Sequence, residues 1–135
     1  MPWKKKEIIL RLNVWFSRKG VEANPLFGQF PYEAMAPTQK KKIVFENESD
    51  LFKELERVYD DALAEPERKY TVGEALFTEF KWFCDPVQFI DRQSQEIIQM
   101  FRYCKLTNSP PYPSIAQTPC YIYDSFIIIG QENGS

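Results

Sequence analysis

The first regular pattern in the chain is an alternation of apolar and polar side chains over residues 7–16. Apolar side chains occupy the even positions of this stretch, which are Ile8, Leu10, Leu12, Val14 and Phe16. Successive side chains of a strand point to opposite faces of a sheet, so this period of two predicts a strand with one buried face. The short apolar run at residues 42–45 predicts a second strand. We expect the two to form a small antiparallel β element.

The segment between these strands, residues 20–39, is rich in proline. Prolines at this density exclude a continuous helix or a central strand. The segment also carries Phe27, Phe30 and Tyr32, which predict that it packs on the domain or on a partner. A stretch of this length without regular structure is uncommon in a compact domain, which makes it a candidate functional region.

Helical spacing and capping residues predict helices after residue 46. A cluster of polar residues at 47–50 is typical of an N-cap, and apolar side chains recur at helical spacing from Leu51 to Leu63. Thr71 and Glu74 have the spacing of a capping box, which predicts a short helix ending at residue 83. A further helix is predicted over residues 86–106.

Two details of the helical part stay open. The polar run that begins at Asp91 divides the helix over residues 86–106 if Asp91 caps its second half. Residues 120–129 have side chains that favour strands, but Thr118 and Pro119 before them are typical of a helix start. We favour a helix ended by Gly130.

Together these patterns predict an α+β fold in which a small N-terminal antiparallel β element packs against three or four α-helices. A length of 135 residues is that of one compact domain. We expect a basic β and loop part over residues 1–46, a mainly helical acidic part over residues 47–130, and a frayed tail over residues 131–135. The 11 Phe, 7 Tyr and 3 Trp residues supply enough large rings for a firm core.

Charge is divided along the chain. Residues 1–42 carry nine basic and three acidic side chains, a net charge of +6, whereas the rest of the chain carries a net charge of −8. Such asymmetry fits contact with a nucleic acid or an anionic surface. We favour the simpler interpretation that the basic part packs beside the acidic part.

The residue types that are missing argue against an enzyme. The chain has no histidine, which removes the usual general base, the usual zinc ligand and every histidine-dependent nucleophile pair. Its five glycines are too dispersed for a phosphate-binding loop. We therefore expect no catalytic residues, no cofactor and no metal.

Cysteine content and hydropathy bear on the compartment. Three scattered cysteines fit a reducing environment, and no apolar run approaches the length of a membrane span. We therefore expect a cytoplasmic protein, or one inside a particle assembled in the cytoplasm, without a membrane partner.

Aromatic side chains, several of them on proline-rich loops, are candidates for protein binding. Acids near the C-terminal end of a predicted helix are further candidates, because the position in the helix does not account for them. Rigid aromatic side chains bury a large area at small entropic cost, although ordinary packing on the core is the alternative. The candidates are Trp15, Phe27, Phe30, Tyr32, Asp60, Asp61, Glu65, Trp82 and Tyr112.

Basic side chains are candidates for phosphate binding. The two lysine triplets would share one end of the β element if its strands ran parallel, and would then form one patch. The alternative is that they protect strand edges and aid solubility. The candidates are Lys4, Lys5, Lys6, Arg18, Lys19, Lys40, Lys41 and Lys42.

The sequence thus favours a non-enzymatic protein that acts by binding another protein or copies of itself. An inhibitor, an adaptor or a subunit of a larger assembly, such as a viral or phage particle, fits this description. The alternative is a nucleic-acid-binding module that uses the N-terminal lysines.

Overall fold

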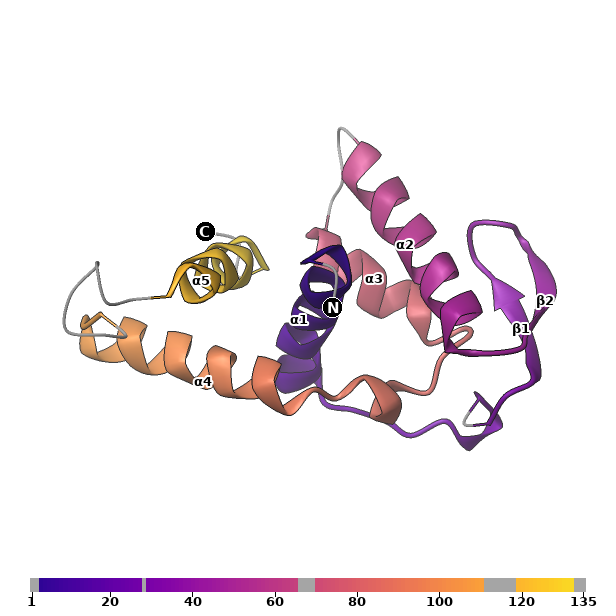
Figure 1. The fold of residues 1–135 in the computed structure, drawn as a ribbon, viewed down its shortest axis with the longest axis horizontal. Coiled ribbons are helices and arrows are strands. Elements are labelled where there is room, and N and C mark those ends of the chain that lie inside the picture. Colours follow the sequence, from indigo (N-terminus) through magenta and orange to yellow (C-terminus); the bar gives the residue numbers. More distant parts are fainter. Residues whose placement is uncertain (1–2, 28, 66–69, 111–118, 133–135) are drawn as a thin grey trace.

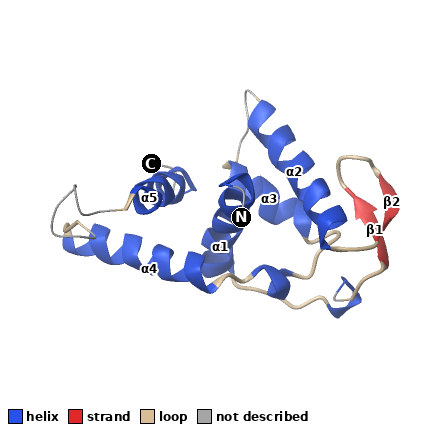
Figure 2. Cartoon of the chain, viewed as in Figure 1, coloured by secondary structure: helices blue, strands red, loops and turns tan. Residues whose placement is uncertain are grey.

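The computed structural model describes residues 3–27, 29–65, 70–110 and 119–132. Within these residues the chain forms five α-helices, two short 3₁₀ helices (η) and one two-stranded antiparallel sheet. Figure 1 and Figure 2 show how the helices and the sheet are arranged. The elements are α1 (Trp3–Lys19), η1 (Pro25–Phe27), β1 (Tyr32–Ala36), β2 (Lys41–Phe45), α2 (Glu48–Ala64), α3 (Val72–Phe80), η2 (Pro86–Phe89), α4 (Arg92–Thr107) and α5 (Cys120–Glu132). The predicted α+β fold with a small N-terminal antiparallel element is confirmed, with five α-helices in place of three or four.

The predicted strand over residues 7–16 is wrong, because these residues belong to helix α1. Positions i and i+2 lie about 200° apart around a helix, so alternating apolar residues line two opposite sides of it. Both sides of α1 are buried, with Ile8 and Leu12 in one hydrophobic cluster and Leu10 and Val14 in another. The period of two therefore reflects a central helix covered on both sides. Figure 1 shows α1 between the α2–α3 pair and the α4–α5 pair.

A β-hairpin occupies part of the segment that was expected to lack regular structure. β1 pairs with β2 so that Ala34 lies opposite Ile43. Pro31 and Pro37 lie immediately outside β1, so neither removes a hydrogen bond from the ladder. The expectation for residues 20–39 is therefore wrong at residues 32–36, whereas the predicted strand over residues 42–45 is confirmed.

The capping residues predicted for α2 and α3 are confirmed. The side chain of Asn47 accepts a hydrogen bond from the backbone N–H of Asp50 at 3.0 Å. The hydroxyl of Thr71 accepts one from the N–H of Glu74 at 3.2 Å. α3 ends at Phe80, earlier than predicted, and residues 81–83 form a turn.

The predicted helix over residues 86–106 is divided at its polar run. η2 ends at residue 89, and the carboxylate of Asp91 then caps α4 by accepting a hydrogen bond from the N–H of Ser94 at 3.0 Å. The side-chain amide of Asn13 holds this junction against α1, because its nitrogen donates to the carbonyl of Phe89 and its oxygen accepts from the N–H of Asp91, both at 3.0 Å.

Residues 120–129 form a helix, as favoured. α5 continues beyond Gly130 to Glu132, so the frayed tail is wrong for residues 131 and 132, and residues 133–135 lie outside the described part. The physical reason is that the side chain of Glu132 is buried and hydrogen-bonded.

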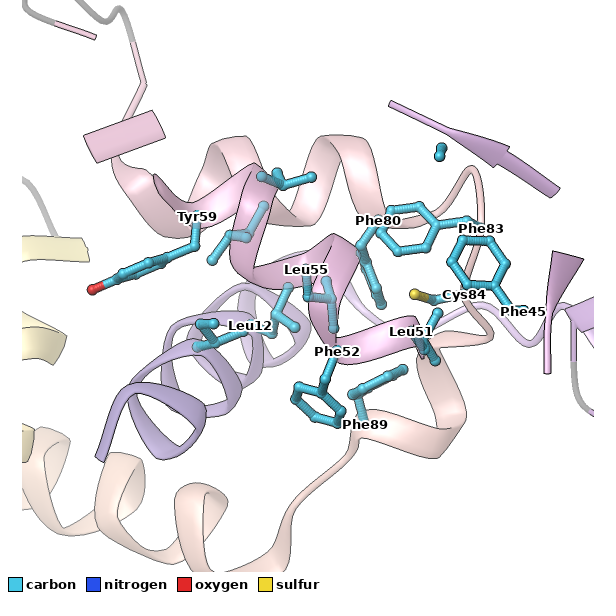
Figure 3. Close-up of a cluster of buried hydrophobic side chains, with 14 of the residues drawn as sticks. Leu12, Phe45, Leu51, Phe52, Leu55, Tyr59, Phe80, Phe83, Cys84 and Phe89 are labelled. Atoms are coloured by element: carbon cyan, nitrogen blue, oxygen red, sulfur yellow. The ribbon is translucent and has the colours of Figure 1, made fainter. Parts of the chain in front are cut away.

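The larger hydrophobic cluster lies between α1, α2, α3 and the hairpin (Figure 3). Aromatic rings fill it, including a stacked pair of Phe45 and Phe83 with centroids 5.6 Å apart and an edge-on pair of Phe80 and Phe89 at 6.0 Å. A smaller cluster lies on the other side of α1, between α1 and the helices α4 and α5. Because α1 contributes residues to both clusters, it is the central helix of the fold.

A buried carboxylate joins α5 to α1 and α3. Glu132 accepts hydrogen bonds from the guanidinium of Arg11 at 2.5 Å, the indole N–H of Trp15 at 2.8 Å, the hydroxyl of Thr71 at 2.5 Å and the backbone N–H of Gly73 at 3.0 Å. A Cβ at position 73 would overlap the carboxylate of Glu132, so any larger residue there would have to displace that side chain. Burial by itself would lower the pKa of Arg11, but the hydrogen bond and charge of Glu132 outweigh it and raise that pKa.

A second buried carboxylate, Glu54, fixes the hairpin turn on α2. It accepts hydrogen bonds from the backbone N–H of Thr38 at 2.9 Å and from the hydroxyl of the same residue at 2.7 Å. Arg57 on the next turn of α2 pairs with it at 2.8 Å. The hairpin is thus held by polar contacts as well as by its apolar face.

Candidate protein-binding surface

The chain that follows α1 crosses the C-terminal end of α3 and encloses a groove of about 870 Å³. Gly20 turns the chain out of α1 with a φ of +85°, a conformation that favours glycine. The backbone N–H of Asn24 then donates to the carboxylate of Asp85 at 3.0 Å. We call this the Trp82 groove. Its lining residues are Lys19, Gly20, Val21, Glu22, Ala23, Asn24, Phe27, Phe77, Phe80, Lys81, Trp82 and Pro86.

Trp82 is the most prominent apolar side chain of the groove. It lies in the turn after α3 and is 57% exposed, although Phe80 two residues earlier is buried in the core. Phe27 and Phe77 are half-buried against that core and form further apolar lining. A large exposed indole in a groove that also contains packed rings is typical of interface hot spots.

Basic side chains dominate the rim of the Trp82 groove. Lys19 and Lys81 line it and are exposed, and Glu22 is the acidic residue of the lining. Arg18 lies next to Lys19 and stacks its guanidinium over the Trp15 ring at 5.0 Å. Among the described residues, neither Lys19 nor Lys81 takes part in a salt bridge. The groove therefore combines an apolar lining with a net positive rim.

The loop aromatics predicted as binding residues pack on the core. The rings of Phe27 and Phe30 lie 5.4 and 5.3 Å from the ring of Tyr32, whose hydroxyl donates to the carbonyl of Phe83 at 2.7 Å. Trp15 is buried beside Glu132. Tyr112 lies outside the described residues.

The three acidic candidates are exposed at the C-terminal end of α2. Asp60 pairs with Lys4 at 2.9 Å, whereas Asp61 and Glu65 form no salt bridge to a described residue. Leu63, two positions from both Asp61 and Glu65, lies on the opposite side of the helix from them and is 48% exposed. Within the described residues, no group of three or more side chains is arranged to hold a metal ion.

The basic candidates do not converge in one place. Lys4, Lys5 and Lys6 lie in the first turns of α1, so the strand pairing that would have joined the two triplets does not exist. Arg18 and Lys19 lie at the other end of the same helix, about 20 Å away.

The lysines at the start of α1 face the acidic helix. Lys4 pairs with Asp60, which raises the pKa of Lys4 through their hydrogen bond. Lys5 lies 3.7 Å from Glu48 and 4.2 Å from the ring centroid of Phe52. The other triplet, Lys40, Lys41 and Lys42, is exposed on the hairpin.

Sequence reasoning missed several residues of this surface. It singled out Trp82 but not Lys81, Phe77 or Val21, because the chain after α1 meets α3 only through long-range packing. It also missed the Arg11–Glu132 pair, although a charged residue inside the apolar run of residues 8–16 is a signal for a buried partner.

No family model, curated protein or solved structure matches this chain. In the described part of the chain, no helix is both long enough and apolar enough to span a membrane.

Proposed function

We propose that this chain is a non-enzymatic protein-binding module whose partner docks in the Trp82 groove. The observation that carries the proposal is Trp82 itself, which is more than half exposed in a groove whose lining includes the packed rings of Phe27, Phe77 and Phe80. Tryptophan dominates the binding energy of many interfaces because it buries a large area and has few rotatable bonds. An inhibitor, an adaptor or an assembly subunit would all use such a surface.

The groove is held open by contacts within the chain, which supports this function. Phe80 belongs to the larger hydrophobic cluster, and Phe27 packs against it. The hydrogen bond from the N–H of Asn24 to Asp85 holds the chain after α1 against the N-cap of η2. A preformed site binds with a smaller loss of conformational entropy than one that has to be ordered by its ligand.

The environment of Cys84 supports the non-enzymatic part of the proposal. This thiol is buried, and desolvation, followed by the nearby charges of Asp85 and Glu54, raises its pKa well above the ordinary value. The thiolate is the reactive form of cysteine, so these surroundings disfavour nucleophilic chemistry.

The nucleic-acid alternative has less support, because two of its lysines already face carboxylates. Lys4 contacts Asp60, and Lys5 lies near Glu48. A protein that binds nucleic acid through lysines needs them free to neutralise phosphates.

Selection of peptides from a random library tests the proposed function without a known partner. Peptides selected on the wild-type protein should lose at least about thirtyfold in affinity for Trp82→Ala, because a hot-spot residue contributes about 2 kcal/mol or more. They should bind Tyr103→Ala as they bind wild type, since Tyr103 is 64% exposed on α4, outside the groove.

Two results would contradict the proposal. One is selected peptides whose binding is indifferent to Trp82. The other is tight binding of labelled DNA or RNA that weakens steeply with salt and is lost when Lys40, Lys41 and Lys42 are replaced, since that pattern indicates phosphate contacts.

A further inference from the structure

Building on the proposed function, we infer that the Trp82 groove binds an acidic segment of another protein, in which a large apolar side chain is flanked by Asp or Glu residues. The apolar side chain packs against Trp82, and the flanking carboxylates contact the lysines of the rim. This combination of an apolar anchor and matched charges determines which partners the groove accepts.

Each side of the groove contributes one exposed lysine. Lys19 is the last residue of α1, at the start of the chain that forms one side, and Lys81 lies directly after α3 on the other side. Neither lysine takes part in a salt bridge to a described residue. A segment that lies in the groove therefore meets a cation from each side, which favours carboxylates on both sides of the anchor.

Two further cations lie beside Lys19 and add to the positive potential at this end of α1. Arg18 precedes Lys19 in the helix, and Arg102 of α4 donates a hydrogen bond to the hydroxyl of Ser17 at 2.7 Å. Both arginines are exposed. Such a potential extends about 8 Å from the surface at physiological salt and speeds the approach of an acidic segment.

Acidic side chains near the groove do not reverse its charge. Glu22 is exposed on the lining and opposes the lysines in part. The carboxylate of Asp85 is 9% exposed and accepts hydrogen bonds from the backbone N–H groups of Asn24 at 3.0 Å and Val87 at 3.2 Å. Glu79 lines the hollow beside the end of α2 instead. Two lysines and one glutamate thus leave the exposed rim positive.

The apolar lining accommodates the anchor of the segment. Val21 and Phe27 come from the chain after α1, and Phe77 and Trp82 come from α3 and its turn. The volume of about 870 Å³ lies in the range of sites that enclose a drug-sized ligand, so a large side chain and its neighbours fit. Burial of the anchor supplies affinity, whereas the carboxylates select the partner.

Single-stranded nucleic acid is another anionic polymer that binds to exposed rings and lysines. It carries a phosphate at every nucleotide and is bound along a continuous basic groove, with its bases stacked on free aromatic rings. Here the lining has two lysines and Glu22, and the rings of Phe27 and Phe77 pack against the core. These features favour a protein segment with a few carboxylates.

Peptide selection on proteins of opposite rim charge gives the sharpest test. Peptides selected on the wild-type protein should be enriched in Asp and Glu around a large apolar residue. The double variant Lys19→Glu/Lys81→Glu should bind these peptides at least about tenfold more weakly, and a selection on this variant should enrich Lys and Arg instead. Circular dichroism checks that each variant is folded.

The chain offers a matched control for the change in net charge. Lys41→Glu/Lys42→Glu alters the charge equally at exposed positions of the hairpin, outside the groove, and should bind the peptides as wild type does. Glu22→Gln removes the acid of the lining and should raise the affinity by up to about fivefold. A variant that had merely lost its structure would not show such a gain.

Binding kinetics separate the contribution of the lysines from that of Trp82. Charges at a rim act mainly on the association rate, whereas a packed anchor acts mainly on the dissociation rate. Raising the salt from about 0.05 M to about 0.5 M should therefore slow association with the wild-type protein. Trp82→Ala should instead speed dissociation.

Three results would overturn the acidic partner. If selected peptides require Trp82 but show no acidic bias, or bind Lys19→Glu/Lys81→Glu as tightly as wild type, the partner is not acidic and the proposed function stands. If the peptides are indifferent to Trp82, both fail. Both also fail if a single-stranded oligothymidylate of about 12 nucleotides binds more tightly than the peptides and requires Trp82 and both lysines.

Discussion

Cys84 is buried and Tyr32 is half-buried, and the surroundings of both side chains favour the neutral form. Burial raises the pKa of Cys84, and the charges of Asp85 and Glu54 act in the same direction. Burial also raises the pKa of Tyr32, whose hydroxyl donates to the carbonyl of Phe83 at 2.7 Å. Both groups lie where the hairpin meets the turn after α3, so their ionisation would disturb the packing next to the Trp82 groove.

Stability should therefore fall at alkaline pH. The ordinary pKa values are 9.0 for Cys84 and 10.0 for Tyr32, and both are raised in the folded protein, so the unfolded chain releases these protons first. Their contribution is fully present below pH 9 and is lost as the pH rises through the folded values. The urea midpoint, measured between pH 7 and 11, should fall less steeply for Cys84→Ala and for Tyr32→Phe than for wild type.

The exposed Tyr103 provides a matched control for this experiment. Tyr103→Phe should leave the alkaline fall unchanged. An equally steep fall in all four proteins would show that other groups cause it.

At the scale of elements, the fold could be predicted wherever the signal is local. Asn47, Thr71 and Asp91 each cap the helix predicted for them, because capping involves residues only three positions apart. α1 was predicted as a strand because its pattern reflects burial on two sides, which depends on helices far along the chain. β1 was missed because the prolines that argue against a strand lie just outside it.

The candidate site shows the same division. The acids at the end of α2 were predicted together because they lie on one helix. The groove around Trp82 could not be predicted, because its two sides are at least 50 residues apart in the sequence. Glu132 is further still from its partner Arg11, at 121 residues, so no local pattern indicates that it is buried.

Thr71 belongs to both local and long-range structure, which allows a quantitative test. Asn47→Ala should cost about 1 kcal/mol of stability, the usual value for a lost cap. Thr71→Ala should cost more, about 2–3 kcal/mol, because its hydroxyl also donates to the buried carboxylate of Glu132. Urea unfolding of the two variants measures the difference, and Thr71→Ser should restore most of the loss.

Equal losses for Asn47→Ala and Thr71→Ala would show that the hydrogen bond to Glu132 contributes nothing. The contact between α3 and α5 would then rest on apolar packing and on the N–H of Gly73.

On the scale of the whole molecule, the opposite charges of the chain are partly matched internally. The start of α1 meets α2 through Lys4 and Lys5, which fits the interpretation that the basic part packs beside the acidic part. Lys19 and Lys81 at the Trp82 groove, and Asp61 and Glu65 at the end of α2, take part in no salt bridge between described residues, so the matching is incomplete.

The most direct test of the proposed function is two-dimensional ¹H–¹⁵N NMR of the wild-type protein titrated with a peptide selected on it. The account predicts that backbone amide shifts change beside the Trp82 groove, at residues 19–24 and 77–82, together with the indole N–H of Trp82. Changes confined to the lysines at the start of α1 and on the hairpin would contradict it.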